Sequence, residues 1–183
     1  MPIERSKRAL PAERIITAAR RLLDASTLCA VSTVSGSGSA HVHTAYFAWT
    51  PEFDIVWLSD PSARHSRNLR ARPSAAIAVY DSNQTWGTSD RGIQLFGSGR
   101  ELADRAAREA GAVYAERFPA FARKDLGAYR FYRVRPRRMK LFDERVFGEG
   151  VFVTATIRRG GEVTWDRTEI VRAREGSTPA GEG

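Results

Sequence analysis

The sequence predicts a mainly β (α+β) protein in which an antiparallel sheet closes, or nearly closes, into a barrel with helices at its rim. Three observations support this fold class. Short runs rich in β-branched and aromatic residues, separated by turn residues, predict seven or eight strands. Only three segments are predicted to be helices, and they do not alternate with strands as βαβ units do. So many strands in 183 residues would expose long edges unless the sheet closes.

The first third of the chain predicts one helix followed by three strands. Pro11 and the apolar residues that recur at helical spacing after it predict a helix over residues 11–26. Turn residues then separate three segments that we expect to form an antiparallel meander: 27–34, 40–49 and 53–59.

A helix-start signal follows the third strand. Asp60 can cap a helix and Pro61 suits its first position, so we expect a short helix over 62–71 that ends before Pro73. Residues 74–81 form a near-continuous apolar run, typical of a strand buried on both faces. The remaining predicted elements are a strand over 91–100, a helix over 101–118, and strands over 128–142, 151–157 and 162–168.

Length and composition predict one domain without membrane segments. Residues 1–10 should be a flexible basic arm, 11–174 the folded domain, and 175–183 a disordered tail. No run of apolar residues is long enough to cross a bilayer, and the N-terminus lacks the apolar stretch of a signal peptide. The single cysteine, Cys29, excludes an intramolecular disulfide. We therefore expect a soluble cytoplasmic protein.

The net charge of +8 comes from clustered basic residues, which favour an anionic partner such as a phosphate or a nucleotide. Nucleic acid is the less favoured partner, because no recognised nucleic-acid-binding motif is present. The two clusters are Arg64, Arg67, Arg70 and Arg72, and then Arg130, Arg133, Arg135, Arg137, Arg138 and Lys140.

Three consecutive segments carry a resemblance to a known family. They are residues 57–73 (WLSDPSARHSRNLRARP), 75–80 (AAIAVY) and 91–97 (RGIQLFG). A strand end, a short helix that closes at a proline, a buried strand and a glycine-containing strand follow one another. This order resembles the FMN-binding split-barrel family that includes pyridoxamine 5′-phosphate oxidase, over roughly residues 22–141. The resemblance implies an antiparallel split β-barrel that assembles as a homodimer and binds a flavin.

The resemblance also implies where the flavin phosphate binds. The strand end and the opening of the helix would hold it, which corresponds here to Leu58, Ser59, Arg64 and His65, with Arg67 one turn further on. A helix N-terminus and arginines are independently suited to a phosphate. The family usually has lysine where His65 stands, so the charge at this position would depend on pH.

The flavin ring in the resembled family lies along the second strand, which corresponds to His43, Thr44, Ala45 and Tyr46. Backbone groups of this stretch would hydrogen-bond the polar edge of the ring. A glutamine often comes from the strand over 91–97; Gln94 is the candidate here, although alignment on the glycine of that strand points to Gly92.

The resemblance implies an FMN-dependent oxidoreductase that transfers hydride to or from a small molecule, with no catalytic acid or base identified. The C-terminal Arg/His segment that grips substrate in pyridoxamine 5′-phosphate oxidase itself is missing, so the vitamin B6 reaction is not expected. The alternatives are a non-catalytic carrier or sensor of flavin, of the deazaflavin F420, or of haem. His41 and His43 share one face of a strand, a spacing compatible with a metal, but no further ligand completes a recognisable set.

Overall fold

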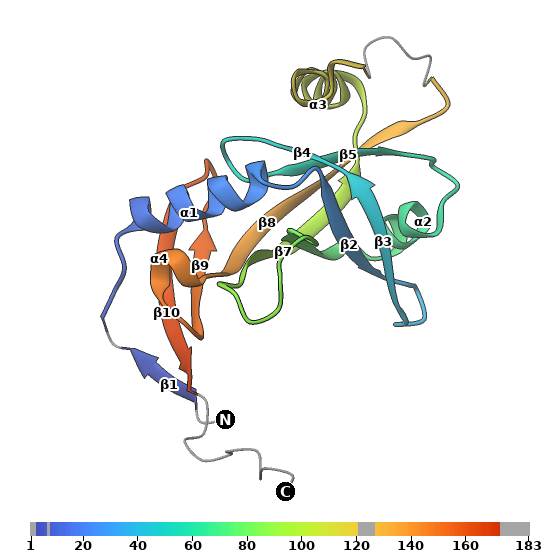
Figure 1. The fold of residues 1–183 in the computed structure, drawn as a ribbon. Coiled ribbons are helices and arrows are strands. Elements are labelled where there is room, and N and C mark those ends of the chain that lie inside the picture. The colour runs from blue at the N-terminus through green and yellow to red at the C-terminus, as the bar shows by residue number, and fades with distance from the viewer. Residues whose placement is uncertain (1–2, 7, 121–126, 173–183) are drawn as a thin grey trace, which may run out of the picture.

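Ten strands form one antiparallel sheet in the computed structural model, which describes residues 3–6, 8–120 and 127–172 (Figure 1). The main path of the sheet runs β1-β10-β9-β8-β7-β6-β2-β3, and β4 and β5 lie off it. The strands are β1 (Ile3–Ser6), β2 (Leu28–Val34), β3 (Ala40–Tyr46), β4 (Ala48–Trp49), β5 (Ile55–Ser59), β6 (Ser74–Tyr80), β7 (Arg91–Glu101), β8 (Arg130–Asp143), β9 (Val151–Ile157) and β10 (Val163–Val171). The helices are α1 (Ala12–Asp24), α2 (Arg64–Ala71), α3 (Asp104–Arg117) and α4 (Glu144–Phe147). The fold is the expected antiparallel split barrel with flanking helices.

The long strand β8 pairs with three other strands. β7 pairs with β8 over residues 132–143, whereas the other edge of β8 pairs with β5 over residues 130–134 and with β9 over 138–142. β3 pairs only with β2, and β5 pairs only with β4 and β8. Within the described residues, no backbone pairing joins β3 to β5, so the sheet is open along a seam between these two strands.

The barrel interior is filled by apolar side chains from every major strand and from α1. Alternation along β6 buries Ala75, Ile77 and Val79, as strand geometry requires. Helix α1 covers the interior with five buried residues at helical spacing: Ile15, Ala18, Ala19, Leu22 and Leu23. The largest fully buried side chains are Trp57 and Tyr132, which stack with ring centroids 5.6 Å apart.

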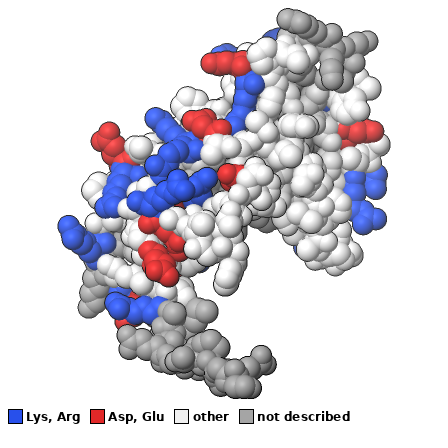
Figure 2. All heavy atoms as spheres, viewed as in Figure 1, with Lys and Arg blue, Asp and Glu red and all other residues white. Residues whose placement is uncertain are grey.

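The outer face of β2, β3 and β6 carries no charged residue. Its outward side chains are Leu28, Ala30, Ser32 and Val34 on β2, Ala40, Val42, Thr44 and Tyr46 on β3, and Ser74, Ala76, Ala78 and Tyr80 on β6. Val42 is 64% exposed and Tyr46 58% exposed. The expectation that the strand over 74–81 is buried on both faces is therefore wrong for a single copy of the chain, because one face of β6 belongs to this outer face of the sheet. Figure 2 shows the contrast: charged side chains gather over α1 and the C-terminal strands, and the surface near β2 and β3 is largely uncharged.

Other boundaries also differ from the sequence expectations. Residues 3–6, expected in a flexible arm, form β1 and pair with β10, which satisfies backbone groups along an otherwise open edge. The third strand of the expected meander, β5, pairs with β8 and not with β3. The tail over 175–183 lies outside the described residues. Among those described, no helix has the length and apolar character needed to cross a membrane.

Candidate cofactor site

All three histidines of the chain meet beside the seam between β3 and β5. His41 and His43 are two residues apart on β3, so both project from its inner face. His65 is the second residue of α2 and packs against them. The rings of His43 and His65 stack with centroids 3.6 Å apart and an interplanar angle of 11°, and His41 lies 6.1 Å from His43.

The histidines are poorly solvated and have few hydrogen-bond partners. Both ring nitrogens of His43 and Nδ1 of His41 are buried and make no well-formed hydrogen bond to any described residue. Nε2 of His65 shares a hydrogen bond with Oγ of Ser59, at 2.8 Å. Such orphaned nitrogens are costly in a folded protein, so they point to a function.

Burial lowers the pKa of both stacked rings. The pKa of His43 falls to about 4, first because of desolvation and then because of His65 and His41, with a small opposing effect of the Val31 backbone. The pKa of His65 also falls to about 4, through burial and then His41, although Asp60 opposes the change. Both rings are therefore neutral at pH 7, available as hydrogen-bonding groups or ligands but not as cations.

Aromatic side chains form the floor beneath this cluster. Trp57 on β5 lies 6.2 Å from the His43 ring, and Tyr132 on β8 meets His65 edge-on at 6.1 Å. The hydroxyl of Tyr132 donates to Oε2 of Glu101, at 3.1 Å. The indole nitrogen of Trp57 is buried without a hydrogen-bond partner among the described residues.

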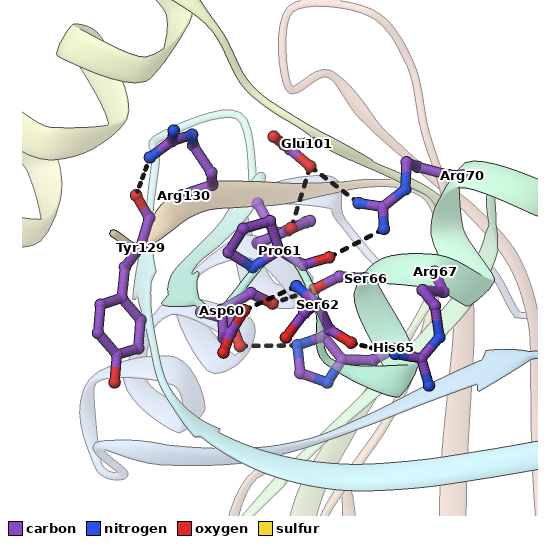
Figure 3. A network of polar contacts seen from close by, with 12 residues as sticks. Asp60, Pro61, Ser62, His65, Ser66, Arg67, Arg70, Glu101, Tyr129 and Arg130 are labelled. Carbon is purple, nitrogen blue, oxygen red and sulfur yellow. Dashed lines mark hydrogen bonds and ion pairs between the residues drawn. The ribbon is translucent and has the colours of Figure 1, made fainter. Parts of the chain in front are cut away.

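A tight turn, not a capped helix start, leads from β5 into α2 (Figure 3). The carboxylate of Asp60 accepts from the backbone N–H of Ser62, at 2.7 Å, and this bond chiefly holds the pKa of Asp60 below its usual range. The carbonyl of Asp60 accepts from Ala63 N and from Oγ of Ser66. The helix starts only at Arg64, so the prediction that Asp60 caps it is wrong. No side chain caps α2, which leaves its first N–H groups able to bind an anion.

The arginines of α2 differ in how they are held. Arg67 donates to the carbonyl of Ser62, and Arg70 bonds both Pro61 O at 2.9 Å and Glu101 at 3.2 Å (Figure 3). Arg64 is exposed at the first helical position and has no polar partner among the described residues. Arg64 is therefore the cation of this helix that is free to meet an anion.

The structure brings some predicted site residues together and separates others. His43, Ser59 and His65 are in contact, with Ala45 on the same face of β3 and Leu58 next to Ser59.

Thr44, Tyr46 and Gln94 lie instead on the outer face of the sheet. Cross-strand pairing sets Thr44, Ala30, Ala78 and Gln94 in one row, so Gln94 is three strands, roughly 14 Å, from β3. Within one chain, Gln94 does not join the histidine cluster.

Sequence reasoning missed three contributors to the site. It weighed His41 only as a metal ligand, although the two-residue spacing already put His41 beside His43 on one strand face. Trp57 and Tyr132 gave no signal, because an aromatic residue in an apolar strand is usually core. Among the described residues, no three or more His, Cys, Asp or Glu side chains are arranged so that they could hold a metal ion.

A separate hollow of about 640 Å³ lies on the outer face, where Arg137 and Arg138 border small residues of β2 and β6. It contains none of the predicted site residues. The candidate site is the histidine cluster, because polar groups from β3, β5 and α2 converge there.

Comparisons with known proteins agree with the fold. The family model described as pyridoxamine 5′-phosphate oxidase matches residues 15–143. No curated protein sequence matches the chain.

Several solved structures share the fold at low identity. A heme binding protein from Mycobacterium smegmatis has a TM-score of 0.65 and 19% identity, over 82% of this chain and 60% of that one. The heme storage protein HutZ from Vibrio cholerae has a TM-score of 0.57 and 19% identity, over 69% and 91%. PhzG from Burkholderia lata 383, in complex with tetrahydrophenazine-1-carboxylic acid, has a TM-score of 0.57 and 16% identity, over 87% and 93%. The chain spans 57% of an Agrobacterium tumefaciens protein of unknown function that also matches, and 60% of the M. smegmatis protein.

Proposed function

Because the chain belongs to the pyridoxamine 5′-phosphate oxidase family, we propose that it binds FMN at the seam between β3 and β5 and acts as an oxidoreductase on a small molecule. The deazaflavin F420 is the alternative cofactor. The observation that carries this proposal is the uncapped start of α2, where the exposed Arg64 precedes His65 and His65 shares a hydrogen bond with Ser59.

The phosphate is the best-supported part of the ligand. The first-turn N–H groups of α2 and the guanidinium of Arg64 would both donate to phosphate oxygens. The hydroxyl of Ser59, at the end of β5, is close enough to His65 to act with it. Asp60 opposes the phosphate through its negative charge, although its carboxylate already accepts from Ser62.

The ring would lie along β3. The free edge of β3 offers unpaired backbone N–H and C=O groups to the polar side of a flavin, because β2 pairs with only one edge. When bound, the flavin supplies hydride transfer. The residues of the chain bind the phosphate, orient the ring and exclude water; no general acid or base is assigned. The small-molecule substrate is not identified.

A second copy of the chain is part of this proposal. The seam is open in one chain, and the neighbouring outer face of β2, β3 and β6 is uncharged and rich in apolar residues. A homodimer through this face would cover the exposed Val42 and Tyr46 and bring Gln94 of each copy toward the partner.

The decisive experiment compares FMN with riboflavin, which lacks the phosphate. We expect the wild-type protein to bind FMN more tightly in a flavin fluorescence titration. Losing one charge-assisted contact costs about 1.5–3 kcal/mol. Arg64→Ala should therefore weaken FMN binding roughly ten- to a hundredfold and leave riboflavin binding unchanged.

Arg108→Ala is the matched control, since Arg108 is exposed on α3 and has no polar partner in the described chain. Equal affinities for the two flavins, with no effect of Arg64→Ala, would exclude the phosphate assignment. Turnover with a panel of reductants and acceptors then separates an enzyme from a carrier.

Haem is the second candidate ligand, and the orphaned nitrogens of His43 and His41 favour it. Metal-bound imidazole must be neutral, and burial keeps the His43 ring neutral at pH 7. Two structural neighbours are a heme binding protein and a heme storage protein. Added haemin should give a Soret band that shifts on His43→Ala; an identical spectrum for the variant excludes His43 as a ligand.

A further inference from the structure

We propose that the hollow bordered by Arg137 and Arg138 is a second ligand site, separate from the histidine cluster, and that it takes a small organic dianion with an apolar body. The site is built from one chain and does not depend on the cofactor proposed above. Its two positive charges come from a local irregularity of β8.

A β-bulge gives β8 two consecutive arginines on the same side of the sheet. Consecutive residues of β7, Phe96 and Gly97, lie opposite residues 138 and 136 of β8, so Arg137 is an extra residue without a counterpart. In a regular strand, successive side chains point to opposite faces. Here Arg137 and Arg138 are both exposed and both line the hollow. The bulge therefore brings two guanidinium groups to one place.

Neither arginine is neutralised by a described residue. Three other cations of β8 are each paired with a carboxylate: Arg133 and Arg135 with Asp54, and Lys140 with Glu169. The side chains of Arg137 and Arg138 make no hydrogen bond or ion pair within the described chain. The guanidinium of Arg138 lies over the ring of Phe96, 5.1 Å from its centroid, and this contact orients the group but keeps its charge. Two adjacent, unpaired guanidinium groups favour a ligand with two negative charges.

The floor of the hollow suits an apolar ligand body. The hollow measures about 640 Å³, within the range of small-molecule sites. Ser32 on β2, Ala76 on β6 and Phe96 on β7 lie in one cross-strand row with Arg138. The ring of Phe96 offers an apolar surface beside the charges. None of the residues that line the hollow is acidic, so a cationic ligand would meet only positive charge.

The hollow straddles the edge of the face assigned above to the homodimer. Its β2 and β6 side belongs to that face, whereas the β7 and β8 side, which carries the arginines, does not. A second copy on the face would therefore add a wall opposite the arginines, and binding of the dianion does not require it.

An NMR titration of the wild-type protein with phthalate, a benzene ring with two adjacent carboxylates, tests the site. The backbone amide signals of Gly97 and Ser98 should shift and saturate, and those of His43 and His65 should not. Benzoate, with one charge, should bind at least roughly fivefold more weakly, and uncharged benzamide should not bind. Phenyl phosphate replaces the two carboxylates by one phosphate, so its affinity at Gly97 shows which kind of dianion the hollow prefers.

Two double variants separate a local effect from a loss of overall charge. Arg137→Gln/Arg138→Gln should weaken phthalate binding at least roughly tenfold. Arg158→Gln/Arg159→Gln is the matched control: it removes two consecutive exposed arginines from the turn between β9 and β10, outside the hollow, and should bind phthalate as the wild type does. Because arginine stays protonated, the affinity of the wild type should not change between about pH 6 and 9.

The outcomes are distinguishable. Equal phthalate affinity in the two double variants, or signal shifts without any at Gly97, overturns this inference and leaves the proposed function standing. A wild-type protein that binds phthalate in the hollow but binds no FMN overturns only the proposed function. Weaker FMN binding by Arg137→Gln/Arg138→Gln, together with no effect of Arg64→Ala, overturns both assignments, because the phosphate of FMN would then occupy the hollow.

Discussion

At the scale of single residues, burial of the histidine pair should make the folded state sensitive to acid. Each ring has a pKa of about 4 when folded and about 6.5 when unfolded. The unfolded chain thus binds more protons between these values, and stability present above pH 6.5 is lost as the pH falls toward 4. After allowance for the partial exposure of His43, protonation of the two rings on acidification should lower the free energy of unfolding by about 2–4 kcal/mol.

The measurement is the free energy of unfolding by urea at pH 7 and at pH 4.5. Carboxylates also titrate in this range, so the comparison is with the double variant His43→Asn/His65→Asn. This variant should lose less stability on acidification than the wild type. Parallel losses in the two proteins contradict the prediction.

At the scale of the elements, one ion pair fastens α1 to the end of β8. Nη2 of Arg21 lies 2.5 Å from the carboxylate of Asp143, whose side chain is fully buried. The other oxygen of Asp143 has no partner within the described chain. Arg21→Ala leaves this carboxylate buried and unpaired, and should cost about 2–4 kcal/mol after allowance for the exposed arginine.

Thermal and urea unfolding of three variants test this anchor. Arg20→Ala, at the exposed neighbouring position, should change stability by less than about 0.5 kcal/mol. Asp143→Asn added to Arg21→Ala should recover part of the loss, because an amide is cheaper to bury than a carboxylate. If Arg21→Ala and Arg20→Ala are equally stable, the anchor contributes nothing.

A second element-scale feature is the close approach of β7 and β8 at Gly97. The pairing register shifts between Phe96 and Gly97, and a Cβ built on Gly97 would lie 2.0 Å from the carbonyl oxygen of Arg135. Backbone cannot yield as a flexible side chain does, so Gly97→Ala should destabilise the fold by about 1–3 kcal/mol or more. Gly36→Ala, in open space within the 35–39 turn, is the control and should have little effect in the same unfolding assay.

The local sequence pattern predicted which helices and strands form better than it predicted where they begin and end or which strands pair. The helical spacing of Ile15, Leu22 and their apolar neighbours predicted both ends of α1 to within two residues, because the residues that the helix buries recur in the sequence at that spacing. The start of α2 was misplaced because Asp60 and Pro61 are equally suited to a turn. Periodicity alone could not show that β5 pairs with β8, about seventy residues away, since pairing depends on the closed sheet.

In the candidate site too, contacts between residues close in the sequence were predictable, and contacts between distant residues were not. Residues next to one another in the chain, such as Ser59 and the start of α2, were found together because local order puts them together. The stacking of His43 on His65 joins two elements that do not pair, so only the folded barrel reveals it. Gln94 was assigned from a strand pattern, which gives the face of a residue but not its distance from another strand.

At the scale of the whole molecule, the basic charge and the uncharged sheet face are segregated. The chain carries a net charge of +8, yet the outward side chains of β2, β3 and β6 include no charged residue, and Arg137 and Arg138 only border this face. A mostly uncharged face of this kind is typical of a surface that a partner covers. This segregation is the physical basis for expecting a homodimer.

We predict that the protein sediments at micromolar concentration with twice the 20.3 kDa mass of one chain. Val42→Arg places a charge on the outer face of β3, where Val42 is 64% exposed and makes no core contact. The fold should persist, but a buried unpaired charge costs several kcal/mol at an interface, so the variant should sediment as a monomer. Thr164→Arg, exposed on β10, is the matched control and should remain a dimer. Because the seam is open in one chain, the monomeric variant should also bind FMN more weakly than the control. A monomeric wild type, or a Val42→Arg protein that stays dimeric, would show that this face is not the interface.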